Sequence, residues 1–304
     1  YDKEFLGGLL MSCFLKLPDQ SVLMVDYTQR SGLYYQIFTQ DQASRPNLLL
    51  SNGTHEYIAF LDGKSRFHVI CKNSRSQIIH LRQSSDGILK DTILDDRNNE
   101  FKIDNLYALS VKDQILLLYY ADHPSTKTPQ LIYHLLKKSL TTPQPLGDLN
   151  TRDINYDCIK YNNDILLAMI RKDKENYNIQ INFLDIDQEQ WQALSTPVTS
   201  KFPITYCKLS IDKKGIYHLI YVQEQYGQYQ LLYKYKDKAN QWSKERLLYS
   251  CGYPLKPIIL IYYDALWINW NENETLKAIL SVDNGNTFSK PIFTSMQDSN
   301  ISLH

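Results

Sequence analysis

The sequence has no excess of charge of either sign and no long hydrophobic run. Lysine and arginine together number 33, and so do aspartate and glutamate, which gives a formal net charge of zero. Nucleic-acid-binding domains usually carry a basic excess or a basic stripe, because neutralising phosphates drives their affinity. The longest apolar runs, 115–120 and 258–263, are far shorter than the roughly 20 residues of a membrane-spanning helix. We therefore expect neither a nucleic-acid partner nor a membrane-spanning segment.

Signatures of catalysis and of cofactor binding are also missing. The chain contains no glycine-rich phosphate loop and no GxSxG nucleophile elbow. Its seven histidines show none of the paired spacings of metal ligands, and its five cysteines form no CxxC pair. The sequence therefore predicts no metal site and no bound cofactor.

The cysteines also bear on the cellular compartment. They are Cys13, Cys71, Cys158, Cys207 and Cys251. An odd number leaves at least one thiol unpaired, and most of the five lie in apolar runs, where a free cysteine packs as a small hydrophobic residue. Because unpaired thiols are typical of a reducing compartment, the cysteines favour a cytoplasmic protein.

Glycine and proline are scarce, at 11 each, whereas tyrosine is abundant, at 23. Aromatic side chains suit the pleated, half-buried surface of a strand. Hydrophobic residues make up 43% of the chain and charged residues 22%, so there is ample material for a core. No long segment has apolar residues at helical spacing with capping signals. The composition therefore favours an all-β protein.

Apolar runs recur along the whole chain at a spacing of about 50 residues, the length of a four-stranded propeller blade. Equivalent positions in the six runs are Leu23, His68, Leu116, Leu166, His218 and Trp267. Each run follows another apolar segment and precedes an alternating segment and then a more polar one, which is the pattern of four successive strands. We expect His68 and His218, which occupy equivalent positions, to pack between neighbouring repeats.

The repeat predicts a single all-β domain over residues 1–304, a six-bladed β-propeller of four-stranded antiparallel blades. The predicted blades are 5–51, 54–96, 101–149, 151–198, 202–250 and 253–295. A parallel α/β fold would need helices between the strands, and a β-sandwich would need no such repeat. Because the sequence begins at Tyr1 and not at methionine, we expect the chain to be part of a longer protein.

One hairpin in the last predicted blade has a recognisable motif. It contains Ser281, Asp283, Gly285, Thr287 and Phe288, in the pattern Ser-x-Asp-x-Gly-x-Thr-Phe. An aspartate can accept backbone N–H bonds within such a turn, and glycine adopts positive φ without strain. Degenerate versions occur at the same place in other units, around Asp86, Asp187 and Asp237. We therefore expect Asp283 to stabilise its own turn and not to take part in catalysis.

This motif resembles the Asp-box, or BNR repeat, of the sialidase-like β-propeller superfamily. The resemblance implies that the hairpin is structural and lies on the face opposite the ligand site. It also implies an exported protein, against the indication from the cysteines. Sialidases use three arginines, a tyrosine–glutamate pair, an aspartate and a Phe/Tyr-Arg-Ile/Leu-Pro motif. That set is not present, since 44–46 is Ser-Arg-Pro without the aromatic residue, so sialidase chemistry is not expected.

The leading functional hypothesis is a non-catalytic recognition module that binds a protein or glycan partner through one face of the propeller. The contacts are expected in the loops between second and third strands, residues 27–32, 72–76, 122–128, 171–177, 224–228 and 271–274. Aromatic residues and arginine contribute most of the binding energy at interfaces. The candidate contact residues are Arg75, Arg171, Tyr177, Tyr226, Tyr253 and Trp270.

The alternative is a carbohydrate-active enzyme, a glycoside hydrolase or a lyase. Acidic residues recur where the second strands end, and glycosidases need two carboxylates about 5 to 10 Å apart. The candidates are Asp122, Asp173, Glu224 and Glu272. The sequence leaves the choice open and favours binding, because no complete catalytic set can be assembled.

Overall fold

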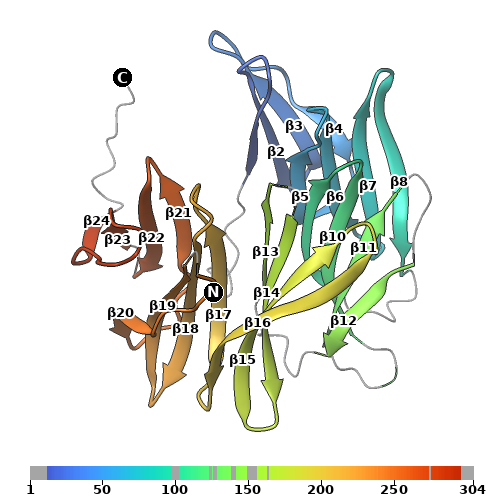
Figure 1. Cartoon of the computed structure of the whole chain (residues 1–304). Coiled ribbons are helices and arrows are strands. Elements are labelled where there is room, and N and C mark those ends of the chain that lie inside the picture. The colour runs from blue at the N-terminus through green and yellow to red at the C-terminus, as the bar shows by residue number, and fades with distance from the viewer. Residues whose placement is uncertain are drawn as a thin grey trace, which may run out of the picture. The chain divides into compact units, whose positions relative to one another are not determined.

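The computed structural model describes residues 12–96, 103–122, 125, 129–137, 142–148, 156–162, 164–237, 239–273 and 275–295. Within these ranges the chain forms 24 strands in six four-stranded sheets (Figure 1). No helix among the described residues is long and apolar enough to cross a membrane. The chain divides into two compact units, residues 1–148 and 149–304.

Unit 1 contains sheets 1 to 3. Sheet 1 consists of β1 (Cys13–Lys16), β2 (Val22–Thr28), β3 (Gly32–Phe38) and β4 (Asn47–Leu50). Sheet 2 consists of β5 (Gly53–Leu61), β6 (Phe67–Asn73), β7 (Gln77–Ser84) and β8 (Gly87–Asp95). Sheet 3 consists of β9 (Asp104–Val111), β10 (Gln114–Asp122), β11 (Pro129–Leu136) and β12 (Gln144–Asp148).

Unit 2 contains sheets 4 to 6. Sheet 4 consists of β13 (Tyr156–Tyr161), β14 (Asp164–Asp173), β15 (Asn176–Asp185) and β16 (Gln190–Ser200). Sheet 5 consists of β17 (Ile204–Ile211), β18 (Tyr217–Gln225), β19 (Gln228–Lys236) and β20 (Arg246–Cys251). Sheet 6 consists of β21 (Ile258–Tyr262), β22 (Ala265–Glu272), β23 (Thr275–Ser281) and β24 (Ile292–Ser295).

In every sheet the four strands pair in sequence order, and every pairing is antiparallel. The predicted number of sheets and of strands per sheet is confirmed, and each of the six apolar runs forms a second strand. The prediction that residues 1–304 are one domain stays a prediction. Residues 9–11, expected to begin the first strand, lie outside the described residues.

Among the described strands, the second strands of sheets 2 to 5 have the longest continuous buried runs, whereas those of sheets 1 and 6 alternate between buried and more exposed residues. All residues of β10 from Ile115 to Ala121 are buried, and so are those of β14 from Ile165 to Ile170. A strand of one layer alternates between a buried and an exposed face, whereas a strand covered on both faces is apolar throughout. The second strands therefore form the core between neighbouring sheets of each unit.

The outermost strands are less polar than the sequence analysis expects. Each sheet except sheet 3 has a large apolar side chain exposed there, namely Leu48, Leu89, Leu194, Leu247 and, in sheet 6, both Ile292 and Phe293. These strands also carry polar residues, and the exposed apolar side chains are dispersed over five sheets. Such scattered exposure is ordinary on soluble proteins and does not by itself mark an interface.

All five cysteines are free thiols. Cys71, Cys158 and Cys207 are buried, and burial raises the pKa of each thiol, that of Cys71 to about 12. Protonated, enclosed thiols are poor nucleophiles. These three cysteines therefore pack as small apolar residues, as predicted, while Cys13 and Cys251 are half-buried.

A buried ion pair joins sheets 4 and 5. Lys208 Nζ lies 2.7 Å from Asp157 Oδ1, and the Leu209 N–H donates to Asp157 Oδ2 at 2.8 Å. Burial alone would lower the pKa of Lys208, but the Asp157 carboxylate holds it above its ordinary value. The carboxylate thus pairs a cation and a backbone donor at the same time.

We expect Asp157→Ala to lower the free energy of unfolding by about 2 kcal/mol or more, because it leaves a partly buried ammonium and a buried N–H without an acceptor. Urea denaturation measures the change. The control is Asp173→Ala, which removes an exposed carboxylate and should shift the value by no more than about 0.5 kcal/mol. Equal shifts in the two variants would contradict the role of the ion pair.

Candidate functional site

Each sheet has two ends that carry different connections. The turns between second and third strands lie at one end, together with the connection to the next sheet. Two hydrogen bonds show this: Ser74 N–H donates to Asn52 O, and Glu224 N–H to Pro203 O, both at 2.8 Å. The predicted binding loops lie at this end, and we therefore call it the predicted end. The first-to-second and third-to-fourth connections lie at the opposite end.

Two predicted tyrosines are exposed at the predicted end of sheet 5. Tyr226, in the β18–β19 turn, is 86% exposed, and Tyr253, just after β20, is 55% exposed. Tyr226 has a φ of 52°, and its ring meets the ring of Phe202 edge-on at 5.4 Å between centroids. Both tyrosines are therefore available to a ligand, and Phe202 supports the ring of Tyr226.

Trp270 is not at the surface, and its predicted role as a contact residue is wrong. Its side chain is 2% exposed and packs against Tyr249 at 4.9 Å between ring centroids. Along β22 the buried residues are Leu266, Ile268 and Trp270, which alternate with more exposed ones. The period of two residues places this ring in the core between sheets 5 and 6.

The other predicted contact residues have mixed surroundings. Arg75 is exposed in the β6–β7 turn. Arg171 and Tyr177 lie within β14 and β15, since the predicted loop 171–177 is only a two-residue turn. Arg171 is half-buried, and the Lys172 ammonium lies 5.2 Å from the centroid of the Tyr177 ring. Residues 123, 124 and 126–128 of the third predicted loop, and Glu274 of the sixth, lie outside the described residues.

The four predicted carboxylates differ in their surroundings. Asp122 belongs to unit 1 and the other three to unit 2, where Asp173 is exposed and Glu224 half-buried. Glu272 is occupied: its Oε2 lies 2.8 Å from Lys277 Nζ and accepts from the Tyr249 hydroxyl at 2.9 Å. Burial would raise the pKa of Glu272, but these hydrogen bonds hold it below its ordinary value. This carboxylate is therefore a hydrogen-bond acceptor at neutral pH and not a proton donor.

The opposite end contains a repeated turn that the sequence analysis does not identify. Asp62 Oδ1 accepts from the N–H groups of Lys64 and Arg66, both at 2.9 Å. Asp212 Oδ1 accepts in the same way from Lys214 and Ile216, both at 2.8 Å. In both turns a histidine follows the aspartate by six positions and is buried. The signal in the sequence is this repeated Asp-x₅-His spacing.

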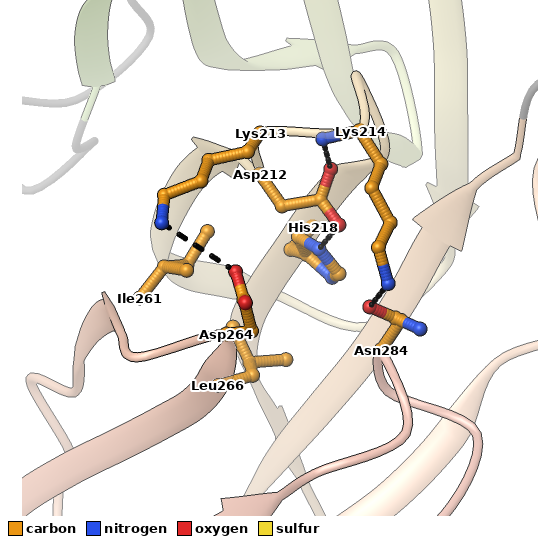
Figure 2. Close-up of a pocket in the computed structure, with 8 residues that line it drawn as sticks. All are labelled: Asp212, Lys213, Lys214, His218, Ile261, Asp264, Leu266 and Asn284. Atoms are coloured by element: carbon orange, nitrogen blue, oxygen red, sulfur yellow. Dashed lines mark hydrogen bonds and ion pairs between the residues drawn. The ribbon is translucent and has the colours of Figure 1, made fainter.

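In unit 2 the aspartate and histidine belong to a closed network, which Figure 2 shows in part. His218 Nε2 lies 3.7 Å from Asp212 Oδ2, and its Nδ1 lies 2.8 Å from the Tyr233 hydroxyl. Lys214 Nζ donates to Asn284 Oδ1 at 3.0 Å, which ties this turn to the hairpin of sheet 6. The remaining cavity has a volume of about 10 Å³, room for one water molecule at most.

The 281–288 hairpin closes this network from sheet 6. Asp283 accepts from Thr287 N–H at 2.8 Å, from Thr287 Oγ1 at 2.6 Å and from Ser281 Oγ at 2.8 Å. These bonds hold the pKa of Asp283 at about 2. Gly285 has a φ of 85°, and a Cβ there would overlap the Tyr233 hydroxyl. Glycine is therefore required both for the turn and for the close approach of the tyrosine.

A serine just after this motif also has a structural role, and it recurs in other sheets. Its hydroxyl accepts a hydrogen bond from an N–H of the third strand, while its own N–H donates to the carbonyl of the same residue. The pairs are Ser44 with Ile37, Ser243 with Tyr235 and Ser289 with Leu280. The segment 44–46, which lacks the aromatic residue of the sialidase motif, thus contains the same structural serine as the hairpins of sheets 5 and 6.

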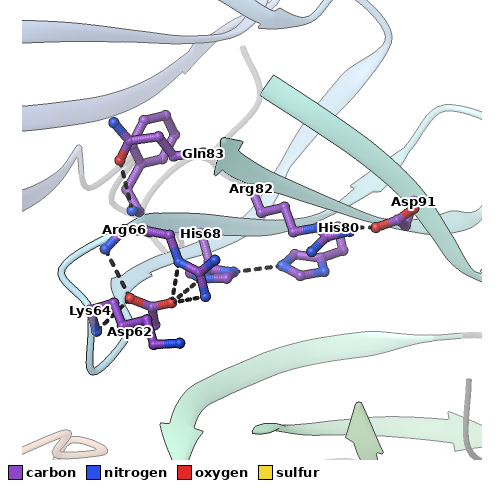
Figure 3. A network of polar contacts seen from close by, with 9 residues as sticks. Asp62, Lys64, Arg66, His68, His80, Arg82, Gln83 and Asp91 are labelled. Atoms are coloured by element: carbon purple, nitrogen blue, oxygen red, sulfur yellow. Dashed lines mark hydrogen bonds and ion pairs between the residues drawn. The ribbon is translucent and has the colours of Figure 1, made fainter. Parts of the chain in front are cut away.

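In unit 1 the equivalent network faces a cleft (Figure 3). His68 Nε2 lies 3.2 Å from Asp62 Oδ2, and His68 Nδ1 lies 2.8 Å from His80 Nε2. His80 takes the place of Tyr233, because each pairs with the residue two positions after the first histidine, Ile70 or Ile220. The cleft has a volume of about 860 Å³ and is lined by residues of sheets 2 and 3.

The protons of this network can be assigned from its chemistry. Burial would raise the pKa of Asp62, but hydrogen bonds from Arg66 and His68 hold it at about 2, so the carboxylate only accepts. His68 Nε2 therefore carries a proton, and Nδ1 of the neutral ring accepts from His80 Nε2. Burial lowers the pKa of His80 to about 4. The lone pair of neutral His80 is thus on Nδ1.

Comparisons with known proteins find similarity in structure only. No protein-family model matches the sequence, and no curated protein matches it. An ulvan lyase, described as a new family of polysaccharide lyase, is similar with a TM-score of 0.60 and 9% identity, over 90% of this chain and 81% of that chain. Its ligand-bound form has a TM-score of 0.59 and 10% identity over the same shares.

A lectin from Aleuria aurantia is similar with a TM-score of 0.50 and 7% identity, over 93% of this chain and 94% of that chain. This lectin is described as a six-bladed β-propeller. Identities this low show the fold alone. The chain is an all-β protein with the fold class of a six-bladed β-propeller of four-stranded antiparallel blades, as the sequence repeat predicts.

For the 281–288 hairpin, we expect Asp283→Ala to lower Tm by a few degrees, because it removes three hydrogen bonds of an exposed turn. Gly285→Ala should lower Tm more, since the added Cβ strains the turn and displaces the buried Tyr233. Calorimetry measures both. A larger loss for Asp283→Ala than for Gly285→Ala would contradict the assigned role of Gly285.

Stability should also fall as the pH is lowered from about 6.5 to 4. The folded-state pKa of His80 is about 4 against an ordinary value of 6.5, so in this window the unfolded state binds a proton that the folded state does not. A second loss should follow between about 3.8 and 2, where Asp62 and Asp283 become protonated. Urea titrations at stepped pH measure both. His80→Tyr should flatten the first decrease, and an unchanged slope would contradict the assignment.

Proposed function

We propose that this chain is a carbohydrate-binding propeller that recognises a glycan at the predicted end of sheets 5 and 6 without transforming it. The observation that carries the proposal is the exposed ring of Tyr226, supported from below by Phe202. A fixed aromatic ring offers a flat apolar surface at low entropic cost, which suits the C–H face of a sugar.

Polar groups near this ring complement it. Tyr253 lies at the same end of sheet 5, because Cys251 pairs with Tyr229, next to the β18–β19 turn. The Glu272 carboxylate, hydrogen-bonded to Lys277 and Tyr249, lies near the end of β22 in the neighbouring sheet. Ionised carboxylates are strong acceptors for hydroxyl groups. Exposed aromatic rings with an ordered carboxylate are a suitable set for a polyhydroxylated ligand.

The structural similarity supports a saccharide ligand. It does not distinguish binding from catalysis, which depends on the residues of the site. One similar protein is a polysaccharide lyase and the other a lectin, so the fold serves both catalysis and binding. The acids favour binding, since Glu272 is held ionised by its partners and Asp173 is exposed. A general acid needs a raised pKa in an enclosed site. We also infer that the 281–288 hairpin is an Asp-box, which has a structural role at the opposite end.

The test is a glycan array followed by calorimetry on the glycan that binds best. Tyr226→Ala should weaken binding by at least about fivefold, because a stacked ring contributes roughly 1 kcal/mol. Tyr263→Ala is the matched control. Tyr263 is 84% exposed, has a φ of 47° and packs edge-on against Tyr262, but lies in the β21–β22 turn at the opposite end. The Tyr263→Ala variant should bind the glycan as tightly as the unaltered protein.

Three results would overturn the proposal. Equal losses in Tyr226→Ala and Tyr263→Ala would remove the predicted end as the site. No binding to any glycan, with binding instead to a protein partner lost in Tyr226→Ala, would keep the site and replace the ligand. Turnover of aryl glycosides or of polysaccharides between pH 4 and 8, abolished by Asp173→Asn or Glu224→Gln in a folded protein, would establish the enzymatic alternative.

A further inference from the structure

The cleft of unit 1 lies away from the predicted end and is unused by the function proposed above. It is formed by the β5–β6 turn and by β7 and β8 of sheet 2, and by the β9–β10 turn and the end of β11 in sheet 3. Its volume of about 860 Å³ falls within the range of small-molecule sites, about 300 to 1,000 Å³.

The lining is polar and carries more cations than anions. Five of the lining residues are lysine or arginine and three are aspartate: Lys64, Arg66, Arg82, Lys112 and Lys137 against Asp62, Asp91 and Asp113. Two of the carboxylates already face arginines, with Asp62 2.6 Å from Arg66 and Asp91 3.4 Å from Arg82. Of the described residues, only Ile93, Ile115 and Leu136 contribute apolar lining, and all three are buried. This surface suits an anion and not an apolar ligand.

The histidine pair adds a directed acceptor to this cationic surface. His80 lines the cleft, and its Nε2 proton is committed to His68. Its Nδ1 therefore presents a lone pair that can accept from a hydroxyl group. Asp62 fixes the orientation of both rings through His68, as carboxylates orient histidines at metal sites and active sites.

We propose that this cleft is a second binding site, for a saccharide that carries a carboxylate or sulfate group. A hydroxyl of the sugar donates to His80 Nδ1, while the anionic group faces Lys64 and Arg82. A simple anion would contact only the lysine and arginine side chains, and a neutral sugar would use only the His80 Nδ1 acceptor. The cleft supplies both kinds of group.

Unit 2 provides an internal reference for this site. There Tyr233 stands in place of His80, so its hydroxyl takes the position of the ring nitrogen that donates to the first histidine. The ring of Phe288 meets that of Tyr233 edge-on at 4.9 Å between centroids, and the cavity beside this network has a volume of only about 10 Å³. The sequence of sheet 3 at residues 137–143 contains neither aspartate nor glycine, and so has no motif like that of 281–288.

The experiment measures binding of four probes to the full chain by calorimetry at low and high salt. They are an oligogalacturonate, a heparin-derived oligosaccharide, a neutral cello-oligosaccharide and inorganic sulfate. We expect one or both acidic saccharides to bind at least about tenfold more tightly than the other two probes, with affinity falling as salt rises. Binding of the oligogalacturonate shows that a carboxylate suffices, whereas binding of the heparin-derived oligosaccharide alone, which carries both groups, indicates that a sulfate is needed.

Two variants locate the binding. His80→Tyr copies the arrangement of unit 2, keeping a donor to His68 while removing the acceptor at the Nδ1 position, and should reduce affinity about tenfold. Lys64→Gln changes an exposed side chain and should reduce both the affinity and its salt dependence. Its control is Lys214→Gln, at the equivalent position of the closed network in unit 2, and it should bind normally.

The outcomes separate this site from the one at the predicted end. Acidic-saccharide binding that survives Tyr226→Ala but is weakened by Lys64→Gln supports the cleft, whatever becomes of the neutral-glycan proposal. Sulfate that binds as tightly as the saccharides would mean a simple anion site and overturn the proposal. The proposal would also be overturned if the neutral sugar bound as tightly as the acidic saccharides. It would be overturned as well if Lys64→Gln left the affinity for the acidic saccharides unchanged, and this test holds even if His80→Tyr fails to fold.

Discussion

The burial of the second strands of sheets 2 to 5 on both faces is the constraint on which the rest of the structure depends. Runs such as Ile115–Ala121 and Ile165–Ile170 have no polar face, so a sheet that contains one is stable only between two neighbours. This requirement packs successive sheets against each other within each unit. It also keeps polar and charged residues out of these runs, while the turns at the two ends of the sheets hold side chains that ligands can reach.

The two ends use their residues differently. At the predicted end of sheet 5, Phe202 supports the exposed Tyr226, and at the same end of sheet 6 Glu272 is kept ionised by Lys277 and Tyr249. At the opposite end, aspartates accept backbone N–H bonds in their own turns and also orient buried histidines. One carboxylate therefore serves both the local fold and the network behind it, and a substitution there affects stability and site together.

The two Asp–His pairs show how one position changes the use of a shared framework. In unit 2, Tyr233 completes the network and needs Gly285 above it, because any larger residue would overlap its hydroxyl. In unit 1, His80 completes the same network with a ring that keeps an unused acceptor and faces a cleft of about 860 Å³. The difference lies in which groups remain available after the internal hydrogen bonds are satisfied.

The sequence by itself determined the number and the order of the strands, because the apolar second strands leave a pattern that recurs about every 50 residues. It also predicted the local role of Asp283, whose acceptors are used within five residues of chain. Only the tertiary structure decided that Trp270 is buried, since which face of β22 is covered depends on sheet 5. Likewise, only packing brings His68 to His80 and places five cations around one cleft, because contacts across strands and between sheets leave no local signal.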